Sequence, residues 1–258
     1  MSYTMMTVFG ITFTFLMATL GASVVFFFKK QIPQALNAIF LGFSSGVMLA
    51  ASIWSLLLPA LESANEGGFA AYSFLPAAVG LLLGGLFLWL LDKLAKQIKG
   101  HKLPTSGSLS KAAKLFIAMT VHNIPEGLAV GFAFGSIQSG GSVSAALGLA
   151  IGMGIQNIPE GAAVALPLRE SKRGRGKCFI FSLLSSVVEP LSAIAGYFLA
   201  ATLQFAQPWL LAFAAGTMLY VVCEELLPDI GESEHRQKAA WSTLIGFVLM
   251  MILDVTLG

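Results

Sequence analysis

Long apolar stretches alternate with short polar connections along the whole chain. A helix needs about 20 mostly apolar residues to cross the hydrocarbon core of a bilayer. Stretches of that length are predicted to be helical, because lipid offers the backbone no hydrogen-bond partner. Eight predicted spans follow, at residues 4–28, 34–61, 72–92, 112–136, 142–168, 178–203, 208–228 and 238–257. The pattern predicts an all-α polytopic membrane protein with one transmembrane domain, residues 1–258, and a cytoplasmic loop at 93–111.

The composition supports this fold class and excludes several others. Charged residues make up 11 % of the chain and apolar residues 56 %, whereas soluble domains contain roughly 25 % charged residues. A soluble domain of this length could not cover its surface with so little charge. The net charge of +2 does not favour binding to nucleic acid. Cys178 and Cys223 form neither a disulfide framework nor a CxxC metal motif.

The basic residues indicate how the chain lies in the membrane. All 15 Lys and Arg residues fall at the connections after spans one, three, five and seven. The connections near 62–71, 136–142 and 203–208 contain none. Basic connections face the cytoplasm, so both termini are predicted to lie outside the cytoplasm, with the protein in the cell membrane. The first apolar stretch has no basic residue before Lys29 and is too long for a signal peptide, so we expect it to be retained.

The chain contains internal repeats. The segment HNIPEG at 122–127 in the fourth predicted span recurs as QNIPEG at 156–161 in the fifth, so the two copies run in opposite directions. Weaker similarities relate span two to span seven and span three to span eight. Together they predict a 3+2+3 arrangement of eight helices with inverted repeats, an architecture typical of secondary transporters.

The repeated motif concentrates polar groups where the chain is otherwise apolar. His122 and Glu126 are four residues apart and share one helix face, as do Gln156 and Glu160. Glu189 adds a third carboxylate from span six. A charge at the bilayer centre costs about 2.5–3.5 kcal/mol on insertion scales, so these carboxylates need protons, water or a cation. Imidazole and oxygen ligands suit Zn²⁺, Fe²⁺, Mn²⁺, Cd²⁺ and Co²⁺. From these residues alone, a seam of hydrogen-bonded amides and protonated glutamates stays open as the alternative.

With these motifs and this layout, the chain resembles the ZIP (Zrt/Irt-like) metal transporters, and the QNIPEG form resembles their GufA-like branch. The resemblance implies that a divalent metal, usually zinc, moves toward the cytoplasm through a binuclear site. The first metal position implied in this way comprises His122, Glu126, Gln156 and Glu160, and the second comprises Asn123, Glu126, Asn157, Glu160 and Glu189. The family often has Asp where Asn157 stands, so the second position carries less charge here.

The resemblance also implies further positions and a partner. Met48 is similar to a span-two methionine near the first metal position, and Glu62 to a carboxylate at the entrance. Glu224 and Glu225 are similar to a His-Glu pair near the cytoplasmic exit, with Glu in place of His. A homodimer is implied by the family alone.

The sequence does not favour the other functions that some of its motifs suggest. A GxSxG hydrolase motif at 42–46 lies inside an apolar helix rather than at a strand–turn–helix elbow. No HExxH protease motif and no phosphate-binding loop occur, so we expect neither an enzyme, nor ATP use, nor a cofactor. We expect transport by alternating access, with a metal-selective channel that uses the same ligands as the alternative.

Overall fold

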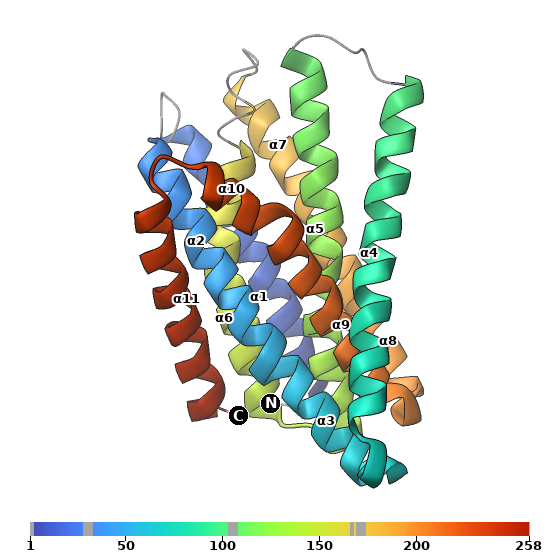
Figure 1. Ribbon diagram of the computed structural model, residues 1–258. Coiled ribbons are helices and arrows are strands. Elements are labelled where there is room, and N and C mark those ends of the chain that lie inside the picture. The colour runs from blue at the N-terminus through green and yellow to red at the C-terminus, as the bar shows by residue number, and fades with distance from the viewer. Residues whose placement is uncertain (1–2, 28–32, 103–107, 166–167, 169–173, 258) are drawn as a thin grey trace.

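The computed structural model describes residues 3–27, 33–102, 108–165, 168 and 174–257. Long helices run roughly side by side, and both ends of the chain lie at the same end of the bundle (Figure 1). The helices are α1 (Tyr3–Ser23), α2 (Gln34–Ala51), α3 (Leu58–Ala64), α4 (Phe74–Lys102), α5 (Ser108–Ser136), α6 (Val143–Ala165), α7 (Arg175–Ser186), α8 (Val188–Thr202), α9 (Gln207–Val221), α10 (Leu227–Glu232) and α11 (Arg236–Leu257).

The helices follow the predicted spans, with differences at their ends. α4 continues ten residues past the apolar stretch, and α5 begins four residues before it, so most of the segment expected as a loop at 93–111 is helical. Only residues 103–107 of that segment lie outside the described part of the chain. Span six is divided at Val187 between α7 and α8. Pro190 explains this break, because it has no N–H to donate to the carbonyl of Ser186.

Two spans contain a π-helical turn at matching places. The turn η2 (Ser52–Leu57) joins α2 to α3, and η8 (Val222–Leu226) joins α9 to α10. A proline follows each turn at the start of the next helix, Pro59 in α3 and Pro228 in α10. A proline in a helix lacks the N–H and crowds the carbonyl four residues before it, and a wider turn relieves that crowding. The sequence similarity between spans two and seven therefore extends to this irregular feature.

The helices pack as two bundles. The motif bundle contains α1, α5, α6, α7 and α8, with its most extensive contacts between α5 and α8 and between α1 and α6. The companion bundle contains α2, α3, α4, α9, α10 and α11, with its most extensive contacts between α2 and α11 and between α4 and α9. In each bundle, exchanging the first three spans with the last three, and span four with span five, converts one helix pair into the other. This pairing is consistent with the predicted inverted repeat.

Glycines allow the paired helices to approach closely. A Cβ atom on Gly84 of α4 would overlap the carbonyl oxygen of Phe213, and one on Gly246 of α11 would overlap that of Phe43. These two contacts are symmetry-related, because Gly84 matches Gly246 and Phe43 matches Phe213 in the repeat. Small residues at such interfaces are typical of helix packing in membranes.

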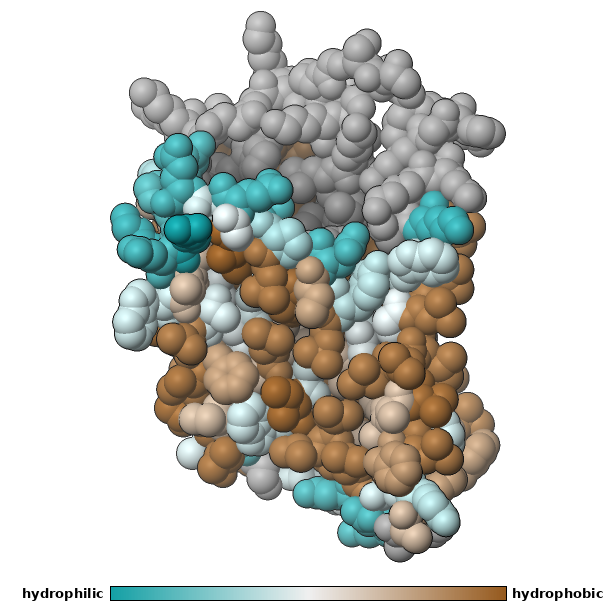
Figure 2. Space-filling view, viewed as in Figure 1, coloured by the Kyte–Doolittle hydropathy of each residue, from teal (hydrophilic) through white to brown (hydrophobic). Residues whose placement is uncertain are grey.

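On the face seen in Figure 2, apolar side chains cover the middle of the molecule, and hydrophilic side chains gather toward its two ends. Within the described residues, six helical segments are long and apolar enough to cross a membrane, in agreement with a polytopic membrane protein. They are Tyr3–Phe26, Gln34–Ala64, Phe74–Leu91, Arg175–Thr202, Gln207–Glu232 and Arg236–Leu257. The other two predicted spans, α5 and α6, carry the polar motif.

Candidate metal centre

The two copies of the repeated motif lie inside the motif bundle on adjacent helices. α5 continues as a helix through Pro125, and α6 does so through Pro159. His122 and Glu126 on α5 and Gln156 and Glu160 on α6 are all buried, with Glu126 and Gln156 fully removed from solvent. The predicted first position is thus a group of polar side chains in the interior of an apolar bundle.

Three side chains of the first position come close enough to share one metal ion. A ligand atom from each of His122, Glu126 and Glu160 lies within 4.8 Å of those from the other two. His122 Nε2 is 3.8 Å from a carboxylate oxygen of Glu126 and 3.8 Å from one of Glu160. Gln156 Nε2 donates a 2.6 Å hydrogen bond to Glu126 Oε1. The four residues implied for the first position are therefore adjacent in space.

The first position contains carboxylate and amide oxygens without hydrogen-bond donors. In the described part of the chain, Glu126 Oε2, Gln156 Oε1 and Glu160 Oε1 are buried and accept no hydrogen bond. A buried oxygen that accepts nothing is costly, because burial removes the water that would otherwise solvate it. A divalent cation bound among these oxygens would remove this cost.

The residues implied for the second position make a different arrangement. Asn157 Nδ2 donates to both carboxylate oxygens of Glu189, at 2.9 and 3.0 Å, and to the carbonyl oxygen of Thr14 on α1, at 3.2 Å. Asn123 Nδ2 donates to the carbonyl oxygen of Ser185 on α7, at 2.9 Å. A small pocket of about 10 Å³, enough for about one water molecule, is bordered by Asn123, Asn157 and Glu160 but not by Glu189.

Helix packing explains why these polar groups meet. A Cβ atom on Gly127 of α5 would overlap the backbone carbonyl of Glu189, so the glycine lets α8 approach α5 at the motif. Gly161 does the same for α1, since its Cβ atom would overlap the carbonyl of Ala18. Glu189 lies in the first turn of α8, where the helix dipole favours a carboxylate. The glycine that ends each motif thus holds a neighbouring helix against the polar cluster.

The remaining predicted site residues are more scattered. Met48 is fully buried on α2 within the main apolar core. Glu62 is exposed on α3 and borders a cavity at the end of the molecule that holds the termini. Glu224 is exposed in η8. The Glu225 side chain lies outside the residues whose side chains the structure describes.

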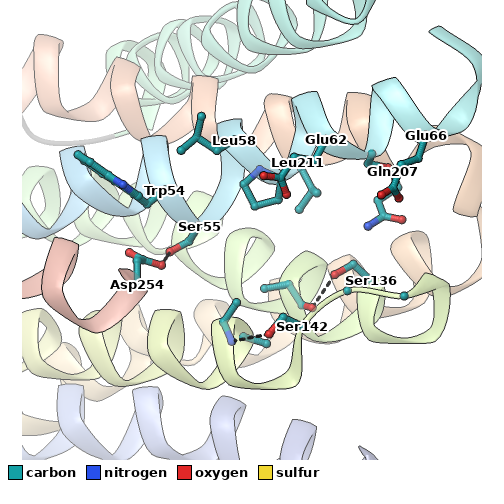
Figure 3. A pocket seen from close by; sticks show the side chains of 17 residues that line it. Trp54, Ser55, Leu58, Glu62, Glu66, Ser136, Ser142, Gln207, Leu211 and Asp254 are labelled. Atoms are coloured by element: carbon teal, nitrogen blue, oxygen red, sulfur yellow. Dashed lines mark hydrogen bonds between the residues drawn. The ribbon is translucent and has the colours of Figure 1, made fainter. Parts of the chain in front are cut away.

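The cavity that Glu62 borders forms a vestibule of about 420 Å³ between the two bundles. Figure 3 shows Ser55 and Asp254 facing each other in it, with Glu62 and Glu66 further along the same wall. Ser55 Oγ donates a hydrogen bond to Asp254, whose other oxygen is buried and accepts none within the described structure. No prediction from the sequence assigned Asp254 to a site. An ionisable residue inside a predicted span was the signal that could have identified it.

The vestibule does not extend to the first position. Ala129 on α5 and Leu149 and Met153 on α6 lie between the vestibule lining and the motif along those helices, and all three are fully buried. From Ala133 in the vestibule wall to Glu126, seven residues of helix span about 10 Å. The polar cluster is therefore separated from the vestibule by packed apolar side chains.

The chemistry available at this centre is the binding of a cation by one imidazole and several oxygens. No thiolate is present in the cluster, and such ligand sets bind zinc and neighbouring divalent ions without the strong retention of thiolate sites. Ligands from α5 and α6 converge from antiparallel directions, as the inverted motif predicts.

Comparison with known proteins identifies the relatives of this chain. The family model described as "ZIP Zinc transporter" matches residues 100–254. The human protein "Zinc transporter ZIP11" is 34 % identical, over 96 % of this chain and 96 % of its own length. "Zinc transporter GufA" of Myxococcus xanthus is 37 % identical, over 80 % of this chain and 81 % of its own length. "Zinc transporter ZupT" of Chlorobaculum parvum is 34 % identical, over 100 % of this chain and 99 % of its own length.

Proposed function

Because this chain belongs to the ZIP zinc transporter family, we propose that it carries divalent transition-metal cations, Zn²⁺ first among them, across the cell membrane toward the cytoplasm. It is an integral membrane protein that transports metal, and it is not an enzyme. In the proposed orientation, eight spans form one domain with both termini outside the cytoplasm. Fe²⁺, Mn²⁺, Cd²⁺ and Co²⁺ are the other proposed substrates, because the same ligand types suit them.

One observation carries the proposal: buried ligand atoms of His122, Glu126 and Glu160 converge within 4.8 Å in the middle of a membrane protein. A hydrogen-bonded polar seam would leave few buried acceptors without donors, whereas one oxygen each of Glu126, Gln156 and Glu160 has no donor among the described residues. We propose these four residues as the first metal position. Glu126 and Glu160 would also border the second position of the binuclear arrangement that the family resemblance implies, with Asn123, Asn157 and Glu189.

Alternating access is the proposed mechanism, with the two bundles as the moving parts. Every ligand of both positions, other than the candidate Met48 on α2, lies in the motif bundle. Its α5–α8 and α1–α6 pairs are more extensively packed than any helix pair that joins it to the companion bundle, where α2–α6, α5–α9 and α6–α11 make the main contacts. Sliding along this interface would carry the whole metal position if α5 and α6 move together.

The buried layer between vestibule and cluster favours a carrier over a channel. A channel needs a continuous path, but in the described part of the chain the buried side chains of Ala129, Leu149 and Met153 lie between the vestibule and the first position. Metal from the vestibule would reach the ligands only after the bundles move. A carrier of this kind has an uptake rate that saturates with metal concentration, whereas channel flux keeps rising linearly.

Zinc uptake into proteoliposomes that contain a zinc-sensitive dye tests the proposal. Glu126→Gln and Glu160→Gln should each lower uptake at least about 100-fold, since loss of even an indirect metal partner costs about 10–100-fold in affinity. Glu232→Gln is the matched control, because Glu232 is an exposed glutamate at the end of α10. Full uptake by either cluster variant, with both proteins folded, would reject the proposed metal position.

A further inference from the structure

The carboxylates of the two proposed metal positions differ in what they already bind. Glu126 and Glu160, which border both positions, each keep a buried oxygen that accepts no hydrogen bond in the described structure. Glu189, which belongs to the second position alone, accepts with both oxygens from the same amide nitrogen, Asn157 Nδ2. Glu189 is 1 % exposed and Asn157 is 2 % exposed, so bulk solvent does not reach these bonds.

The chemistry around Asn157 fixes which way its amide points. Nδ2 faces three acceptors, the two oxygens of Glu189 and the carbonyl oxygen of Thr14. Turning the amide over would set Oδ1 against the same three oxygens, where it could donate nothing. The amide nitrogen of Asn157 therefore occupies the place at which a cation bound by both carboxylate oxygens of Glu189 would lie.

Charge balance leads to the same conclusion. Glu126, Glu160 and Glu189 together carry three negative charges when ionised. One bound divalent cation leaves a single negative charge. That charge would remain on Glu189, whose carboxylate already accepts hydrogen bonds from the Asn157 amide. A second divalent cation would leave a net positive charge in a buried site, which is unfavourable without a further anion. An aspartate at position 157 would supply that anion.

We propose that the amide of Asn157 takes the place of a second cation, so that each chain binds and carries one divalent ion at a time. This inference rests on the proposed function. The ion occupies the first position, with His122, Glu126, Gln156 and Glu160. Asn157 acts as a positioning residue that keeps Glu189 hydrogen-bonded, and Asn157→Asp opens the second position.

Zinc stoichiometry of the purified chain in detergent tests the inference, by equilibrium dialysis against Zn²⁺ followed by elemental analysis. The wild-type chain should saturate at one zinc per chain, and Asn157→Asp at two. The double variant Asn157→Asp with Glu189→Gln should return to one, because it removes the carboxylate that the second ion needs. Glu232→Gln, an exposed substitution away from both positions, should stay at one.

Several outcomes would overturn it. Two zinc ions per wild-type chain, or one zinc per chain in folded Asn157→Asp, would each contradict the role of the amide. If Asn157→Asp does not fold, the wild type and Glu189→Gln decide the question, because zinc-induced changes in the carboxylate infrared bands should be the same in both. If a zinc-induced change in a carboxylate band is lost in Glu189→Gln, zinc binds Glu189 in the wild type, and the inference is overturned. No zinc binding and no zinc uptake by the wild type would instead remove the proposed function beneath it.

Discussion

The two halves of the motif bundle share a framework but differ in their chemistry. Asn123 donates to the carbonyl of Ser185, and Asn157 donates to that of Thr14. Gly127 lies against the backbone of Glu189, whereas Gly161 makes the same contact with Ala18.

The position that holds a carboxylate in one half therefore holds a methyl group in the other. His122 likewise corresponds to Gln156. Close packing follows the repeat, and so do Glu126 and Glu160. The imidazole of His122 and the carboxylate of Glu189 have no counterpart in the other half.

If the framework is symmetric, matched substitutions in the companion bundle should have matched effects. Gly84→Leu and Gly246→Leu each place a side chain against the backbone of the facing helix, at Phe213 and Phe43. Each should lower the free energy of unfolding by about 3 kcal/mol, the upper end for overpacking, because a backbone cannot move aside easily. Thermal unfolding in detergent measures this effect.

Gly176→Leu is the control for this pair, since no atom lies within 4 Å of a Cβ atom built there. A large effect at only one of Gly84 and Gly246 would break the proposed symmetry.

A substitution in the vestibule should have a smaller effect, and it tests the attraction of cations rather than the packing of helices. Asp254 offers a buried carboxylate oxygen to the vestibule, and removing its charge should lower the local concentration of cations. Asp254→Asn should reduce zinc uptake at subsaturating zinc by about threefold, less than the loss expected at Glu126. Dye-loaded proteoliposomes measure the rate.

Ser55→Ala serves as the companion variant, because it removes the hydrogen bond to Asp254 but keeps the charge. An unchanged rate in Asp254→Asn would exclude the vestibule from the uptake route.

Much of this arrangement could be predicted from the sequence. The apolar spans, the all-helical fold and the inverted motif were readable because lipid permits few backbone structures and because polar residues stand out in apolar helices. Helical spacing predicted that His122 lies with Glu126 and Gln156 with Glu160, and the family resemblance implied that the two pairs meet.

The features that could not be predicted from the sequence are contacts between helices whose residues are not related by any regular spacing. The hydrogen bonds from Asn157 to Glu189 join α6 to α8, and the pairing of Ser55 with Asp254 joins η2 to α11. Glu189 and Asp254 are each the only acidic residue of their helix, so no pattern along the chain marks these contacts. The π-helical turns were also missed, although Pro59 and Pro228 stand beside them.

The central claim is that zinc binds at His122 with oxygen ligands from the two motif helices. X-ray absorption at the zinc edge of the purified, zinc-loaded chain tests it directly, because a bound imidazole gives a distinct scattering signature. The chain has three histidines, and His235→Gln provides the matched control. We predict a single imidazole among oxygen ligands in the wild type and in His235→Gln, and no imidazole signal in His122→Gln. An imidazole signal that survives in His122→Gln would contradict the account.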